Sequence, residues 1–275
     1  MNTITGYQPD AAYFRFAEYS EFDPAMVLEV LQNRLLGVMF RGVIGLAARQ
    51  AVSQRFWDSQ RTRRREDAPS YFLGSYSYDK SASAYLDESA QVAPSVAAVL
   101  GTGDGSPWHW FRRRVADELR RQGMCLRTAA MDGRQACPAL IRSWDAAGEF
   151  SLRPHEDMAQ CLDPRQAGFE VQRVTKYEIC AVNICLANGT GGRLVIWNIQ
   201  PDSACRKRLG MEFTGYPYPV PALAEFSELR IDVRPGDLYV FNGSHVHAVE
   251  ANQGTRTNLT FFMGFRDSQT VITWT

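Results

Sequence analysis

The stretch PGDLYVFNGSHVHAV, residues 235–249, contains two turns, a strand between them and the start of a further strand. Pro235-Gly236 and Asn242-Gly243 are turn dipeptides, and residues 238–241 between them are apolar or aromatic. Comparable short runs follow one another from about residue 138, at 139–144, 150–154, 177–186, 193–199, 229–233, 256–265 and 271–274. Many short strands without intervening helices indicate antiparallel sheets, as in a sandwich or a jelly roll.

The first half of the chain has a helical pattern instead. Asp23 followed by Pro24 is a good helix start, and apolar residues then recur at helical spacing, which predicts a helix over 24–36. Further helices are expected at 46–57, 81–100 and 106–122, with Pro94 breaking or kinking the third. We therefore predict a mainly β fold with flanking helices: a single domain, 1–275, with a mostly helical flank at 1–137 and a jelly-roll core at 138–275. Residues 201–226, with four prolines, are expected to form a loop over an opening.

Composition narrows the classes of partner. The 275 residues carry 30 Lys and Arg against 30 Asp and Glu, a balance that gives no basic footprint for nucleic acid or an anionic membrane. No stretch is long and apolar enough to cross a bilayer, and the N-terminus lacks the pattern of a secretion signal. The six cysteines are dispersed without metal-site spacing, which is typical of thiols in a reducing cytoplasm. A cytoplasmic protein acting on a small molecule is expected, and a homo-oligomer is left open.

Two histidine-containing segments supply candidate metal ligands. His155 and Asp157 form a His-x-Asp at the end of a predicted strand, where alternation points both side chains to one face. In a jelly roll, a late strand can return beside an early one, so that His247 completes a triangle. Two imidazoles and one carboxylate are the ligand set of non-haem Fe(II), with positions left for a co-substrate and O₂. His245 is the alternative third ligand, and a polar histidine at a sheet rim is the alternative for each residue alone.

An arginine follows at the start of the next long strand. A buried Arg256 would need an anionic partner, because an unpaired guanidinium in an apolar interior costs several kcal/mol. Its planar pair of donors suits the distal carboxylate of a dicarboxylic co-substrate, and Asn258 on the same face could assist. A surface hairpin arginine is the alternative interpretation.

Five elements in this order resemble the Fe(II)/2-oxoglutarate-dependent dioxygenases: His155-x-Asp157, residues 191–198, residues 236–243, His247-Ala248-Val249 and Arg256. Over most of the chain the likeness is to a bacterial branch with N-succinyl amino acid hydroxylases and hapalindole-type alkaloid halogenases. The resemblance implies a double-stranded β-helix, with iron on His155, Asp157 and His247. It also implies that iron chelates 2-oxoglutarate through the C1 carboxylate and keto oxygen, while the C5 carboxylate binds Arg256.

The implied reaction consumes O₂, releases succinate and CO₂, and hydroxylates an unactivated C–H bond, with an amino acid or N-acyl amino acid as the expected substrate. Because the halogenases of this branch have glycine where this chain has Asp157, hydroxylation is favoured over halogenation. A halogenase or desaturase, and a non-catalytic cupin-like binding module, are the alternatives.

Substrate-binding residues are less determined by sequence. The resemblance places the loop at 70–80 against the pocket, which makes Tyr71 and Phe72 candidates, and Phe261 is a third. Packing is the alternative role for each of these. Arg142 is a candidate internal cation near the metal or a substrate carboxylate, with a solvent-facing strand arginine as the alternative.

Overall fold

The computed structural model describes residues 3–65, 70–144 and 148–275, which form a mixed α/β fold around a large, mostly antiparallel sheet. The strands of this sheet, in spatial order, are β2 (Phe16–Tyr19), β3 (Gly37–Phe40), β16 (Leu238–Asn242), β11 (Ile179–Ala187), β19 (Arg256–Asp267), β9 (Leu140–Trp144), β5 (Ser70–Leu73) and β4 (Arg63–Arg64). Off this path, β20 (Thr270–Trp274) pairs with β19 and with β6 (Cys125–Thr128).

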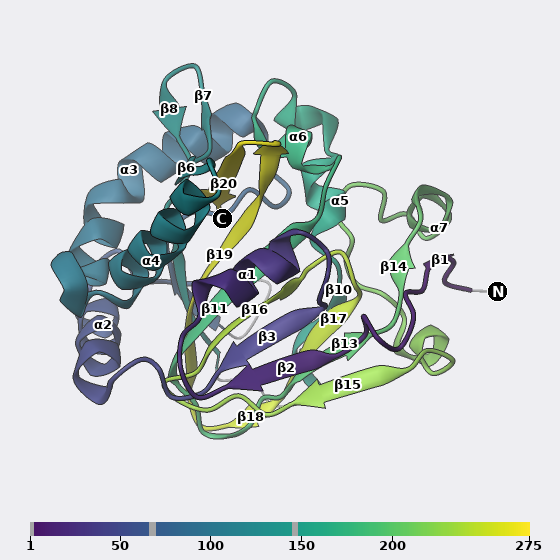
Figure 1. Cartoon of the computed structure of the whole chain (residues 1–275), viewed down its shortest axis with the longest axis horizontal. Coiled ribbons are helices and arrows are strands. Elements are labelled where there is room, and N and C mark those ends of the chain that lie inside the picture. The colour runs from purple at the N-terminus through teal and green to yellow at the C-terminus, as the bar shows by residue number, and fades with distance from the viewer. Residues whose placement is uncertain (1–2, 66–69, 145–147) are drawn as a thin grey trace.

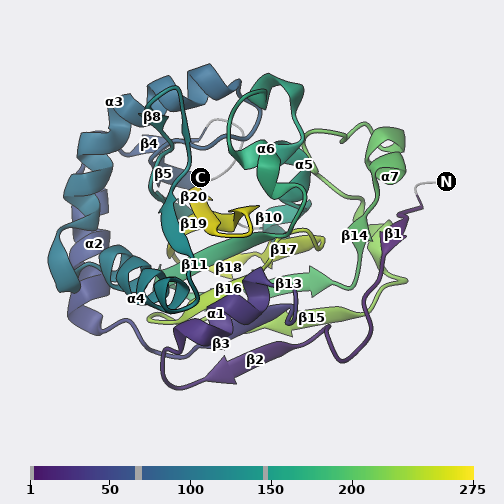
Figure 2. The same cartoon turned by 45° about the horizontal axis from the view of Figure 1, so that its top comes forward.

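A smaller sheet provides the second wall of the core. Its order is β10 (Phe150–His155), β17 (His247–Glu250), β13 (Leu194–Trp197) and β15 (Glu228–Ile231). Three two-stranded ladders complete the β structure: β1 (Gly6–Tyr7) with β14 (Gln200–Pro201), β12 (Thr190–Gly191) with β18 (Asn252–Gln253), and β7 (Ala130–Met131) with β8 (Arg134–Gln135). Figures 1 and 2 show the small sheet beside β11, β16 and β19.

Helices cover the side of the large sheet that faces away from the small one (Figures 1 and 2). They are α1 (Pro24–Leu31), α2 (Leu46–Asp58), α3 (Ala82–Leu100) and α4 (Pro107–Arg121). Of the short helices α5 (Met158–Cys161), α6 (Val171–Val174) and α7 (Ser203–Arg208), α7 lies beside β14 (Figure 1) and packs with β13 of the small sheet. The main core lies between this layer and the sheet, where Phe111 of α4 meets Phe261 of β19 edge to face at 5.5 Å. Among the described residues, no helix has both the length and the apolar character needed to cross a membrane.

The structure corrects three sequence-based expectations. The helix predicted over 24–36 ends at Leu31, because Asn33 adopts a left-handed conformation (φ 57°) and the chain then extends into β3. Pro94 does not interrupt α3, since it lies on the exposed side, where water can satisfy the carbonyl that its missing N–H leaves unbonded. The first 137 residues contribute more strands than the run at 38–43 that the sequence indicates and that β3 confirms, and the β2–β3 and β6–β20 pairs are parallel. The segment β2–α1–β3 joins two parallel strands and is therefore a crossover connection. The sequence pattern predicts antiparallel sheets and gives no sign of this connection.

Asp237 fixes the turn that begins β16. Its buried carboxylate accepts hydrogen bonds from Arg41 Nη1 at 2.7 Å and from the backbone N–H groups of Gly42 and Arg234 at 2.9 Å each. The turn therefore joins the end of β3 to the strand that leads to His247.

Replacing Asp237 with alanine should lower the free energy of unfolding by about 1–3 kcal/mol, because two backbone donors lose their acceptor while Arg41 keeps its hydrogen bonds to Glu18. Urea unfolding followed by circular dichroism measures the change. Asp232→Ala is the matched control, since that side chain is exposed nearby on the same connection. Equal stability of the two variants would contradict the assigned role of Asp237.

Candidate metal centre and central cavity

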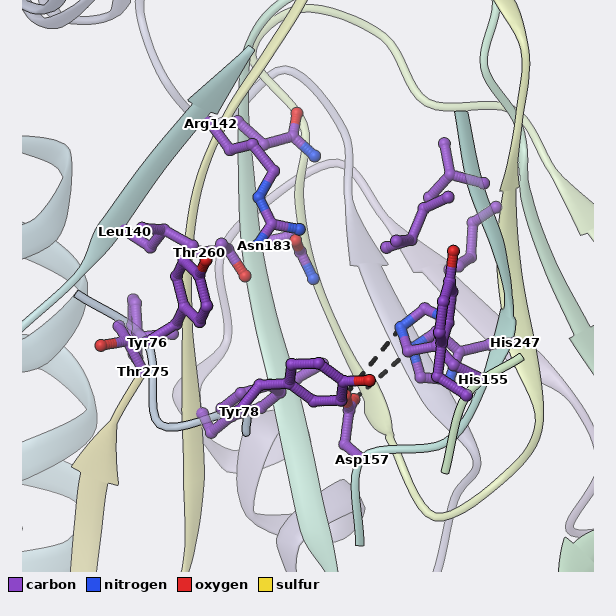
Figure 3. Close-up of a pocket in the computed structure, with 18 of the residues that line it drawn as sticks. Tyr76, Tyr78, Leu140, Arg142, His155, Asp157, Asn183, His247, Thr260 and Thr275 are labelled. Atoms are coloured by element: carbon purple, nitrogen blue, oxygen red, sulfur yellow. Dashed lines mark ion pairs between the residues drawn. The ribbon is translucent and has the colours of Figure 1, made fainter. Parts of the chain in front are cut away.

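Three ligand atoms converge where β10 ends and β17 begins. His155 is the last residue of β10 and pairs directly with His247, the first residue of β17, and Asp157 follows two residues after His155. One ligand atom from each side chain lies within 4.8 Å of the other two. The Nε2 atoms of His155 and His247 lie 4.0 and 3.5 Å from the carboxylate of Asp157 (Figure 3).

Hydrogen bonds to backbone carbonyls orient both imidazoles. His155 Nδ1 lies 2.8 Å from the carbonyl oxygen of Arg153, and His247 Nδ1 lies 2.9 Å from that of His245. A carbonyl only accepts, so each Nδ1 carries the hydrogen and each Nε2 presents a lone pair. Two lone pairs and a carboxylate aimed at one point are a donor set for a cation, with outer-shell contacts of the kind that fix metal-binding histidines.

The electrostatics of the cluster are consistent with neutral imidazoles. Burial lowers the pKa of His155 to about 4 and lowers the pKa of His247 well below its ordinary value. Burial, with a smaller contribution from the charge of Glu156, raises the pKa of Asp157 well above its ordinary value. Neutral imidazoles are the form that binds a metal, and a bound cation offsets the cost of a buried carboxylate.

The backbone around Asp157 leaves little room for other arrangements. Its N–H donates to the carbonyl oxygen of Gly243 at 2.8 Å, and a Cβ at position 243 would lie 2.6 Å from Asp157 Oδ2. Glycine is therefore required at 243 for the strand pair and the carboxylate to approach one another.

His245 does not join the cluster. Its ring packs on the other side of the chain, with centroids 5.9 Å from both Tyr13 and Phe14, and its Nδ1 lies 3.2 Å from the carbonyl oxygen of Trp197. The choice of His247 over His245 thus rests on the position of the side chains in the fold.

Exchanging the two histidines for phenylalanine separates their roles. His245→Phe should leave Fe(II) affinity nearly unchanged, because the carbonyl oxygen that orients His247 belongs to the backbone. His247→Phe should weaken Fe(II) affinity by more than about 100-fold, which is the largest loss expected when only an outer-shell partner is removed. Titration of the anaerobic protein with Fe(II) measures both affinities, and equal losses would contradict the assignment.

The candidate carboxylate anchor lies on the large sheet. Arg256 is fully buried and donates to the carbonyl oxygen of Gly192 and, at 2.9 Å, to the hydroxyl of Tyr239. Asn258 donates to the same hydroxyl at 3.2 Å. Because the Tyr239 oxygen accepts twice, its own hydrogen is available to a ligand. Arg256 Nε has no hydrogen-bond partner among the described residues. A carboxylate would satisfy these donors, and Tyr239 is a member of the set that sequence reasoning missed.

A cavity, called here the central cavity, lies between the two sheets and includes the three candidate ligands. Tyr239 and Asn258 line it. Arg256 is not among the lining residues but donates a hydrogen bond to Tyr239. Its other lining residues include Arg65, Tyr76, Tyr78, Leu140, Arg142, Asn183, Thr214, Tyr216, Thr260 and Phe262. Figure 3 shows Tyr76 and Arg142 across the cavity from the imidazoles, and the ring of Tyr78 extending toward Asp157.

The structure places the three candidate substrate residues differently relative to the central cavity. Tyr71 and Phe72 do not line the central cavity: Tyr71 packs on Trp57, and Phe72 packs behind Tyr76 with ring centroids 5.6 Å apart. The loop at 70–80 does reach the cavity, through Tyr76 and Tyr78. Phe261 borders the cavity, but its ring packs against Phe111 among the helices, and strand alternation turns Phe262 inward instead. A strand register was needed to make these choices.

The segment at 201–226 is fastened to the ligand-bearing strand. The N–H groups of Glu156 and Tyr218 donate to the carbonyl oxygens of Gly215 and Pro154 at 3.0 and 2.8 Å. Thr214 and Tyr216 of this segment line the central cavity. The segment, which includes α7, thus lies beside the metal ligands, and its covering of an opening stays a prediction.

The two facing sheets and the His, Asp and His donors define a non-haem metal site of the type used by Fe(II) oxygenases. No protein-family model matches the chain. The chain is 34% identical over 209 residues to an L-isoleucine 3(1)-dioxygenase of Pantoea ananatis (strain AJ13355), which spans 74% of this chain and 69% of that protein.

Among solved structures, an N-substituted L-amino acid dioxygenase from Burkholderia ambifaria AMMD has a similar fold. The TM-score is 0.60 at 14% identity, covering 92% of this chain and 91% of that one. The same dioxygenase in complex with α-ketoglutarate (2-oxoglutarate) gives a TM-score of 0.61, again at 14% identity, with 91% and 90% covered. The chain belongs to the Fe(II)/2-oxoglutarate-dependent dioxygenase superfamily. It is an enzyme that uses iron and 2-oxoglutarate.

Proposed function

We propose that this enzyme hydroxylates an unactivated C–H bond of a free or N-acylated L-amino acid. The observation that carries the proposal is the convergence of His155, Asp157 and His247 in a cavity that also has a carboxylate-binding end. The Pantoea relative, named for L-isoleucine, supports an amino acid substrate, and the Burkholderia dioxygenase is named for N-substituted L-amino acids.

In this proposal each group of residues has a defined task. His155, Asp157 and His247 hold the iron, and Tyr239 and Asn258, backed by Arg256, hold the distal carboxylate of 2-oxoglutarate. Iron with 2-oxoglutarate supplies the activation of O₂ and the abstraction of hydrogen, with release of succinate and CO₂. The chain itself binds and orients the substrate, so that the C–H bond nearest the metal reacts. Tyr216, whose ring lies 6.3 Å from that of His155, helps to exclude water from the site.

The carboxylate at position 157 favours hydroxylation over halogenation, because as a ligand it would leave no place at the metal for a halide. The same residues argue against a non-catalytic binding module, which would have no use for two oriented imidazole lone pairs.

We further propose that the two sheets form a double-stranded β-helix and that residues 1–275 act as one dioxygenase domain. The likeness of fold to the Burkholderia enzyme supports the first, and strands from both halves of the chain within the large sheet support the second. We also propose that the enzyme acts on a small molecule in the cytoplasm and does not bind nucleic acid. Its zero net charge and six free cysteines support this proposal. A homo-oligomer stays open.

The test is turnover of the purified chain with Fe(II), ascorbate, 2-oxoglutarate and chloride over a panel of free and N-acyl L-amino acids that includes L-isoleucine. We expect succinate release in step with a product that has gained one oxygen atom. A chlorinated main product would contradict the role of Asp157, and an iron-loaded protein that releases no succinate with any panel member would contradict the proposed function.

A further inference from the structure

Arg142 occupies the middle of β9 and faces the central cavity. Its strand neighbours in register are Asn258 on β19 and Phe72 on β5. Strand alternation places Leu140, Arg142 and Trp144 on one face, and all three line the cavity. The guanidinium carbon lies 5.4 Å from the ring centroid of Trp144, a contact that holds the cation on the cavity wall.

Polar side chains surround this cation at the centre of the wall. Asn183 of β11 pairs in register with Thr260 of β19, and both line the cavity. Figure 3 shows the guanidinium of Arg142 directed toward Asn183, across the cavity from His155 and His247.

The position of Arg142 differs from that of the co-substrate anchor. Arg256 pairs in register with Trp144, at the end of β9, and its Nη2 donates to the hydroxyl of Tyr239. Arg142 lies one cavity-facing position further along β9, toward Leu140 and the aromatic side chains of Tyr76 and Tyr78. Arg142 therefore serves a different place in the cavity from Arg256, which lies behind Tyr239. Arg65, a further lining arginine, packs over the ring of Tyr76 at 5.3 Å, and the place at Arg142 has aromatic walls suited to an apolar body.

We propose that Arg142 binds the α-carboxylate of the amino acid substrate, with Asn183 and Thr260 beside it, and that Tyr76 and Tyr78 pack against the rest of the molecule. This assignment rests on the proposed function and deepens it, because it makes a carboxylate the feature by which the substrate is recognised. A guanidinium offers two parallel donors to a carboxylate, and so fixes orientation as well as charge. The carboxylate held there sets which carbon of the substrate reaches the metal.

The test compares each accepted amino acid of the panel with its amide, which keeps the shape and loses the negative charge. The unaltered enzyme should prefer the acid in kcat/KM by about 30-fold or more, the size expected for a buried charge pair. In Arg142→Met the preference should fall to within about threefold, because the acid loses its partner and the amide loses little. Arg142→Lys, which keeps the charge without the planar pair of donors, should retain part of the preference.

Two further measurements keep the assignment open to refutation. The KM for 2-oxoglutarate should stay within about threefold in Arg142→Met, since Arg256 serves that ligand; an increase as large as the loss for the amino acid would reassign Arg142 to the co-substrate. Arg230→Met is the matched control, because this arginine is exposed on β15 outside the cavity lining. It should leave the acid preference and the KM for 2-oxoglutarate unchanged. Retention of the acid preference in Arg142→Met would overturn the proposal while leaving the proposed function standing. An unaltered enzyme that accepts no panel acid would overturn both.

Discussion

Glycine in place of Asp157 should reduce kcat/KM for hydroxylation by about 100-fold or more, which corresponds to at least about 2.7 kcal/mol of transition-state stabilisation. The carboxylate is the only anionic side chain among the three converging ligands, so its removal leaves two neutral imidazoles to hold a divalent ion. Iron affinity should fall together with turnover, and the vacated position should give the variant at most weak halide binding.

The fold should survive this substitution. The carboxylate of Asp157 accepts one long hydrogen bond, at 3.3 Å from Gln160 Nε2. The absence of a side chain at Gly243 leaves room for this carboxylate. The metal-free variant should therefore unfold at a similar urea concentration to the metal-free parent. Asp58→Gly, at the exposed end of α2, provides a matched aspartate-to-glycine control. Hydroxylation that continues at the parental rate in Asp157→Gly would exclude Asp157 as a ligand.

Replacing Arg256 with methionine should raise the KM for 2-oxoglutarate by about 30-fold or more, since a carboxylate at Tyr239 and Asn258 loses the cation behind them. Tyr239→Phe should have a smaller effect, of about tenfold, because it removes one hydroxyl donor and keeps the charge. Initial rates of succinate release at varied 2-oxoglutarate measure both. An unchanged KM in Arg256→Met would move the anchor elsewhere.

Although Arg256→Met should bind 2-oxoglutarate more weakly, the folded variant should be at least as stable as the parent. Arg256 is fully buried, and one of its nitrogens has no hydrogen-bond partner among the residues the structure describes, so without 2-oxoglutarate it is a buried charge with incomplete compensation. Replacing such a group with an apolar side chain of similar length is often neutral or stabilising. We expect Arg256→Met to unfold no earlier than the parent in the absence of 2-oxoglutarate, and to lose the rise in Tm that 2-oxoglutarate gives the parent.

The sequence was sufficient for most of the strands and helices, because alternating apolar runs and turn dipeptides are local signals. It was insufficient where distant contacts decide. Nothing local distinguishes Leu35 and Leu36 in an extended segment from a last helical turn, and the parallel pairing of β2 with β3 depends on the helix packed between them. Pro94 could remain in a helix because of its exposed side, a fact about the surface of the folded molecule.

The candidate site divides in the same way. His155 and Asp157 could be proposed because two residues of one strand share a face by local geometry. Tyr239 could have been found by alternation from the candidate strand at 238–241, yet its link to Arg256 is a contact between strands. Tyr76 and Tyr78 could not be separated from Tyr71 and Phe72, since the point at which the chain leaves β5 determines which rings turn inward.

Because His155 pairs directly with His247, a metal ion bound to both would link two neighbouring strands of the small sheet. β10 is an edge strand of that sheet, and its ladder with β17 has two irregularities in register before it reaches the histidines. A bound ion would join the two strands where their pairing is least regular, and we expect iron binding to stabilise this strand pair more than the outer layers. Loading of iron would therefore also strengthen the wall of the cavity that the substrate faces.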